Sequence, residues 1–199
     1  MKRGAATRAI VSARLRRESA FLILALVFAL LLVWMQPRRD FRAAFEGSLL
    51  LGMLIAVTAA LRQLGRRLRE IEVCERSAPL YGRELARAVA LVPCAIVTAV
   101  AAVYWIASGI DSPVQAALAV LTIAAANAVA VVALSATLRT GTLKALYIAF
   151  SIAIGLPALL ARDAENAGIV AGVAAVYIVA ALVALRQFGE ALARYDPVE

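Results

Sequence analysis

The side chains best suited to chemistry in this chain lie inside long apolar stretches, and they are only mildly reactive. They include hydroxyl groups, phenols and a carboxamide, at Thr58, Thr98, Tyr104, Thr122, Asn127, Ser135, Ser151 and Tyr177. Asn127 is the costliest of these to bury in an apolar medium, so it should face another helix or a cavity. A hydrogen bond between packed helices is the common use of such a residue, and contact with a substrate is the alternative.

Several common kinds of reactive site are excluded by residues that the sequence lacks. The chain contains no His, so no imidazole can ligate a metal or haem, or act as the base of a serine protease dyad. No G-x-x-x-x-G-K-[ST] segment can hold the phosphates of ATP. The apolar stretches carry no buried carboxylate of the kind that proton-coupled carriers use. We therefore expect a non-enzymatic chain with no metal and no cofactor of its own.

Six stretches are long and apolar enough to cross a bilayer as helices. A spanning helix needs roughly 20 mostly apolar residues to cover about 30 Å of hydrocarbon. The predicted spans are residues 20–35, 47–61, 88–108, 114–138, 143–161 and 167–185. Pro93 and Pro157 lie within two of them and predict bends, with a gating hinge as the alternative use. The sequence thus predicts an all-α polytopic membrane protein whose residues 1–199 form a single domain.

The basic residues collect on one side of these spans. If the N-terminus is cytoplasmic, the outer connections hold four of the 21 Lys and Arg residues, namely Arg38, Arg39, Arg42 and Arg162. This bias follows the positive-inside rule and predicts that both termini are cytoplasmic. It also accounts for the net charge of +8 without a nucleic acid partner. Trp34 and Trp105 then lie at the outer ends of their helices, where amphipathic rings are enriched.

Two charged elements are expected on the cytoplasmic side. The N-terminal segment 1–19 predicts an amphipathic surface helix with Ile10, Val11 and Leu15 on one side and arginines suited to anionic lipid elsewhere. A solvated basic segment is the alternative. Residues 62–87 predict a helical hairpin that bends at 77–82, because Pro disfavours helix in the residue before it and Gly tolerates unusual dihedral angles. Such charged hairpins are often simply solvated, and docking of a cytoplasmic partner is the alternative.

The order of these elements resembles the membrane subunits of type-2 ABC exporters, and it is most similar to the haem exporter protein B family of cytochrome c maturation. The likeness covers most of the chain. Three sequences carry it: residues 14–19; Ala60-Leu61 with Glu75, Pro79-Leu80 and Leu85-Ala86-Arg87; and residues 138–143 with Ile148, Ile152 and Pro157-Ala158-Leu159-Leu160. The chain departs from the family at residues 72–77, which lack the usual Gly, and at Arg87, which replaces Lys.

The resemblance implies a multi-pass permease subunit of the bacterial inner membrane, paired with a second copy or a similar subunit. A separate cytoplasmic ATPase would bind ATP and Mg²⁺ and drive transport. The resemblance also implies a coupling helix that docks on this ATPase, formed by Ser77, Ala78, Pro79, Leu80, Tyr81 and Gly82. Haem export is the implied role within the group. The alternatives are the substrate-binding subunit of an energy-coupling-factor importer, another small-molecule carrier, or a non-transporting membrane scaffold.

Overall fold

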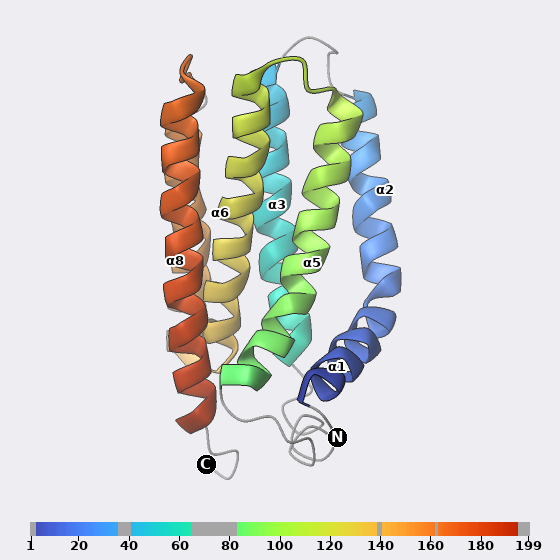
Figure 1. Cartoon of the computed structure of the whole chain (residues 1–199), viewed down its shortest axis with the longest axis vertical. Coiled ribbons are helices and arrows are strands. Elements are labelled where there is room, and N and C mark those ends of the chain that lie inside the picture. Colours follow the sequence, from blue (N-terminus) through green and yellow to red (C-terminus); the bar gives the residue numbers. More distant parts are fainter. Residues whose placement is uncertain (1–2, 36–40, 65–82, 139–140, 162, 195–199) are drawn as a thin grey trace.

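The computed structural model describes residues 3–35, 41–64, 83–138, 141–161 and 163–194. Its elements are α1 (Arg3–Arg17), α2 (Ser19–Met35), α3 (Phe41–Leu64), α5 (Arg83–Ser108), α6 (Pro113–Thr137), α7 (Gly141–Gly155), the 3₁₀-helix η2 (Leu156–Ala161) and α8 (Ala167–Arg194). No strand occurs in these ranges. The long helices run side by side, and α1 lies across one end of the bundle (Figure 1). The predicted all-α class is confirmed.

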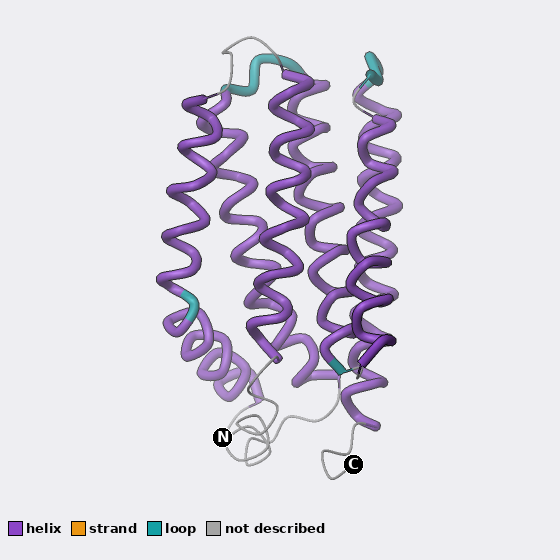
Figure 2. Tube along the Cα trace, turned by 180° about the vertical axis from the view of Figure 1, so that it is seen from behind, coloured by secondary structure: helices purple, strands orange, loops and turns teal. Residues whose placement is uncertain are grey.

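Five segments of the described chain are long and apolar enough to cross a membrane: Phe41–Gln63, Glu84–Ser108, Pro113–Thr137, Thr142–Ala161 and Ala167–Arg194. Helix α2 adds a sixth if it is counted together with α1, from which it is bent by 61°. The beginning of α1 and the end of α8 lie at the same end of the bundle in both views (Figures 1 and 2). The molecule therefore has the five to six apolar helices of a membrane-spanning protein.

Two helices are longer than the apolar stretches predicted, because packing continues past the apolar runs. Helix α3 begins at Phe41, within the predicted outer connection 36–46, and Ala44 and Phe45 are buried in its first turns. This extension also brings Glu46 into the helix, where it is half-buried. Helix α8 continues to Arg194, well beyond residue 185, and Phe188 is fully buried in the added part.

Helix α6 is the centre of the bundle and packs against α3, α5, α7 and α8. Its buried side chains are mostly small, including Ala124, Ala125 and Ala126. Small side chains let helix backbones approach closely, which is a main source of helix association in lipid. At Gly52 of α3, an added Cβ would lie 3.1 Å from Ala126 Cβ. The close contact of α3 with α6 thus depends on these small residues.

The predicted fifth span is divided in two. The α-helix α7 ends at Gly155, and the chain continues as η2, with Pro157 exposed in its first turn. Because Pro has no N–H to donate, a helical hydrogen bond is lost at this point. The helix type thus changes beside Pro157, and the bend predicted there stays a prediction. Pro93 lies inside α5, which is one continuous helix element from Arg83 to Ser108, and the bend predicted at this residue also stays a prediction.

Candidate functional site

The predicted coupling residues Ser77, Ala78, Pro79, Leu80, Tyr81 and Gly82 lie outside the described residues. The helices on either side of them are described, since α3 ends at Leu64 and α5 begins at Arg83. Both of these helix ends lie at the end of the bundle that α1 crosses (Figure 1). The candidate site is therefore the polar cluster at this end, which we call the α1–α3 corner: Arg14, Glu18, Ser19, Arg62 and Gln63.

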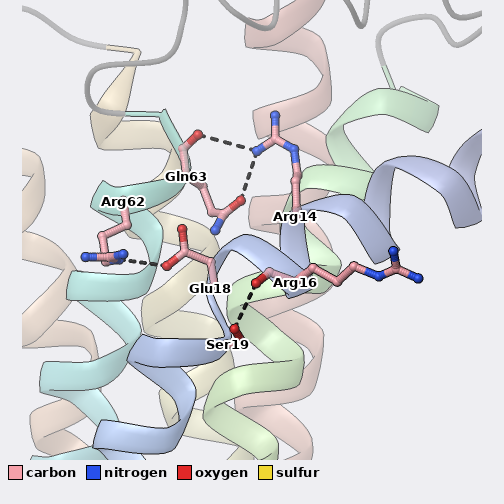
Figure 3. Close-up of polar contacts among 6 residues, drawn as sticks. All are labelled: Arg14, Arg16, Glu18, Ser19, Arg62 and Gln63. Carbon is pink, nitrogen blue, oxygen red and sulfur yellow. Dashed lines mark hydrogen bonds and ion pairs between the residues drawn. The ribbon is translucent and has the colours of Figure 1, made fainter.

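The first contact of the corner joins α1 to the last turn of α3. Arg14 Nη1 donates to Gln63 Oε1 at 2.9 Å and to the Gln63 carbonyl oxygen at 3.4 Å (Figure 3). The last carbonyls of a helix have no partner within the helix, and a cation beside them also interacts favourably with the helix dipole. Arg14, from α1, thus provides a hydrogen-bond donor for a carbonyl oxygen at the C-terminal end of α3.

The second contact is an ion pair between the α1–α2 junction and α3. Arg62 Nε donates to Glu18 Oε2 at 2.7 Å (Figure 3). The Glu18 side chain is 5% exposed and that of Arg62 is 49% exposed. The Arg62 guanidinium also lies 5.1 Å from the centre of the Phe21 ring, within cation–π range. A carboxylate removed from water needs such a partner, so Glu18 and Arg62 hold the junction against α3.

The junction itself is a bend within a continuous hydrogen-bonded chain. Glu18 N–H donates to the Arg14 carbonyl, and Leu22 N–H donates to the Glu18 carbonyl, as in a helix. Ser19 Oγ donates to the Arg16 carbonyl at 2.9 Å (Figure 3). This side-chain bond lies at the point where α2 is bent by 61° from α1.

Asn127 joins two helices, as the packing interpretation expects. Its Nδ2 donates to Thr98 Oγ1 of α5 at 3.0 Å and to the Ile123 carbonyl of its own helix at 2.8 Å. Its Oδ1 is buried and has no partner among the described residues. The structure therefore supplies a packing role for Asn127.

A different residue, Tyr177 of α8, reaches the break between α7 and η2. Its hydroxyl donates to the Ile154 carbonyl at 2.6 Å, and the backbone of Ala158 also hydrogen-bonds this hydroxyl. In a regular α-helix the Ile154 carbonyl would accept from the Ala158 N–H. The phenol therefore serves both backbone groups where the helix is interrupted. In the sequence, Tyr177 is distinguished only as a polar residue of a predicted span.

The other polar side chains of the spans do not converge on one place. Ser135, Ser151 and Thr122 each donate to the carbonyl four residues earlier in their own helix. Thr122 Oγ1 also lies 3.4 Å from Ser48 Oγ of α3. Among the described residues no group of three or more His, Cys, Asp or Glu is placed to hold a metal ion.

One expectation for the aromatic residues is wrong. Trp34 is 81% exposed, as the interface position predicts, but Trp105 is only 2% exposed. The Trp105 ring packs edge to face with Tyr104 inside the bundle, and its Nε1 has no partner among the described residues. Its position near the helix end was predicted correctly, but its side of the helix faces the core, so the ring cannot act as an interface anchor.

Comparison with known proteins gives no relative for this chain. No protein-family model matches it, and neither the curated proteins nor the solved structures yielded a match. Function is therefore inferred from the sequence and geometry of the chain itself.

Proposed function

We propose that this chain is the membrane-spanning permease subunit of an ATP-driven ABC exporter. A separate cytoplasmic ATPase would bind ATP and Mg²⁺, and a second permease copy or a similar subunit would complete the pathway. The haem-export type linked to cytochrome c maturation is the specific form of this proposal. Because the chain has no His, haem coordination by imidazole would fall to a partner protein.

The observation that best supports this proposal is the α1–α3 corner. The connection that carries the proposed coupling helix leaves α3 at Leu64, next to Arg62 and Gln63, and enters α5 at Arg83. Arg62 and Gln63 are the residues that bind α1 and the α1–α2 junction. A displacement of the connection by an ATPase would therefore act on α3, α5 and the N-terminal helices together. Transmission of this kind is what a permease driven from outside the membrane requires.

The connection also offers a chemically suitable anchor. Leu80 and Tyr81 are the large apolar residues of the proposed coupling helix, and Arg76, Arg83 and Glu84 flank it in sequence. Interface energy is usually concentrated in a few such anchors, whereas charges at the rim mainly orient the partner. We expect Leu80→Ala/Tyr81→Ala to weaken ATPase binding by about 2–4 kcal/mol, the range of interface anchors.

The test is co-purification of an ATPase after extraction of the full chain in mild detergent. The wild type should retain the ATPase and stimulate its ATP turnover, and the Leu80→Ala/Tyr81→Ala variant should lose both. Arg66→Ala, in the charged stretch that follows α3, serves as the control and should retain most binding. Equal retention by the double variant and the wild type would refute docking at residues 77–82. Saturable ligand binding by the isolated chain, with no ATPase retained, would instead favour the small-molecule carriers.

A further inference from the structure

Helix α1 presents an exposed face that the α1–α3 corner does not use. The helix contains Arg3, Arg8, Arg14, Arg16 and Arg17 and no acidic residue. Arg14 turns inward to Gln63, while Arg8, Arg16 and Arg17 are exposed. The exposed residues between them are small: Ala9, Ser12 and Ala13. We call Arg8, Ser12, Arg16 and Arg17, with these two alanines, the arginine face.

Two of the three large apolar residues of α1, Val11 and Leu15, already have protein contacts, and all three are half-buried. Val11 and Leu15, which the sequence analysis expected at the membrane surface, pack against the core of the bundle. The arginine face therefore has no large apolar side chain to insert into lipid. Attraction between α1 and any outer partner must come mainly from charge. This separates α1 from surface helices that bind membranes by burying an apolar stripe.

The position of the arginine face is fixed by the helix that follows. On α2, Ile23, Leu24, Val27 and Phe28 are exposed large apolar side chains. They form an exposed apolar surface, suited to lipid, that begins within two turns of Arg17, or about 9 Å along a helix. The 61° bend carries α1 away from the α2 axis at this point. The arginines thus lie at the edge of the apolar surface, where lipid headgroups are found.

We propose that the arginine face of α1 binds the phosphate groups of anionic phospholipids at this edge. A guanidinium group presents several N–H donors in a planar fork that suits phosphate oxygens. Arg8, Ser12 and Arg16 recur every four residues, so they lie on the same side of the helix. The small side chains between the arginines leave the headgroups free to approach. Lipid is the occupant rather than an acidic protein because the face adjoins exposed apolar surface on α2. The proposal does not depend on the proposed transport function.

The test compares lipid binding by the detergent-solubilised full chain and two triple variants. Phosphatidylglycerol and phosphatidylcholine with identical acyl chains are the probes, and bound lipid is counted by native mass spectrometry. Arg8→Gln/Arg16→Gln/Arg17→Gln removes the three positive charges of the arginine face. Gln was chosen because its helix propensity is high. Arg42→Gln/Arg186→Gln/Arg194→Gln removes the same charge from exposed arginines elsewhere. Inorganic phosphate, added as a competitor, tests for a soluble ligand.

The wild type should prefer phosphatidylglycerol, and the face variant should bind it at least tenfold more weakly, given roughly fivefold per basic residue near an anionic surface. Binding of phosphatidylcholine should not change, and the control variant should stay within about twofold of the wild type. Unchanged phosphatidylglycerol binding by the face variant would overturn the proposal. An equal loss of phosphatidylglycerol binding in the control variant would also overturn it, because binding would then depend only on the net charge of the protein. Displacement of the lipid by an equal concentration of inorganic phosphate would show that the face selects a soluble anion.

Discussion

A carboxylate that loses its water needs a charged or hydrogen-bonding partner, and Glu18 obtains both from Arg62. It is the only acidic residue before Asp40 in the sequence. That isolation at the end of a basic segment is the one sequence signal that could have singled it out. The partner could not be predicted from the sequence, because Arg62 is far from Glu18 along the chain and meets it only when α3 packs beside the α1–α2 junction.

Tyr177 gives the first prediction at the scale of single residues. Tyr177→Phe removes the hydroxyl that serves the Ile154 carbonyl and the Ala158 backbone. The Ile154 carbonyl would then lose this hydrogen bond in an apolar environment, where water cannot replace it. We expect a loss of about 1 kcal/mol in the free energy of unfolding, the scale of such bonds between membrane helices. Equilibrium unfolding in detergent measures it.

Ser135→Ala is the matched control for this hydroxyl. Ser135 Oγ bonds only weakly, at 3.5 Å, to a carbonyl of its own helix. Its removal should therefore leave the stability within about 0.5 kcal/mol of the wild type, as for most such substitutions. If Tyr177→Phe is no worse than Ser135→Ala, the interrupted helix does not depend on the phenol.

At the scale of elements, we expect the α1–α3 corner to help hold α1 in place, in addition to the packing of α1 against α5. Arg14→Ala/Glu18→Ala removes the partners of Gln63 and Arg62, and the remaining charge on Arg62 is half-exposed rather than buried. Ala has the highest helix propensity, so the helix itself is not weakened. Hydrogen exchange of the amides of residues 8–17 should become at least tenfold faster, because local opening becomes easier when contacts are lost. The amides of α6 should remain protected.

Arg16→Ala/Arg17→Ala is the control for this experiment, since both side chains are exposed on the same helix. Measured in a zwitterionic detergent, this variant should exchange at the rate of the wild type. If the corner variant matches it, then the packing of Val11 and Leu15 alone holds α1 on the bundle.

The elements themselves were largely predictable, and their ends were not. A long apolar run must satisfy its backbone internally, so a helix follows from composition alone. The ends of α3 and α8 depend instead on Phe45 and Phe188, which are buried by other helices. An irregularity at Pro157 was predictable, because Pro lacks an N–H. The hydroxyl that bonds the Ile154 carbonyl beside it was not predictable, because Tyr177 comes from α8. The candidate site was predictable only in part, because the contacts of Arg14 and Glu18 are tertiary.

At the scale of the whole molecule, burial is uneven across the bundle. In α6, 72% of the residues in the most apolar 18-residue stretch are buried. The corresponding fractions are 17% in Thr142–Ala161 and 22% in Ala167–Arg194. Exposed apolar side chains such as Leu146, Phe150, Val176 and Leu182 cover these two segments. Patches of this kind mark contact with a membrane or another protein. The bundle thus has a packed centre and an outer side suited to lipid or to a second subunit.

The distribution of charge gives the last prediction, which concerns orientation. The turn between α5 and α6, which contains Asp111, and the C-terminal end of α8 lie at opposite ends of the bundle (Figure 1). Asp111 and Arg186, in the C-terminal part of α8, are both exposed. The positive-inside rule assigns the Arg186 end to the cytoplasm.

In a chain with Cys74 and Cys94 replaced by Ala, Asp111→Cys should therefore react with a membrane-impermeant maleimide in intact cells. Arg186→Cys should react only after permeabilisation, which confirms that its thiol is accessible. Labelling of Arg186→Cys in intact cells, with none at Asp111→Cys, would show that the orientation is the reverse of the predicted one. Residues 65–82 would then lie outside, where no ATPase can reach them, so this measurement also bears directly on the proposed function.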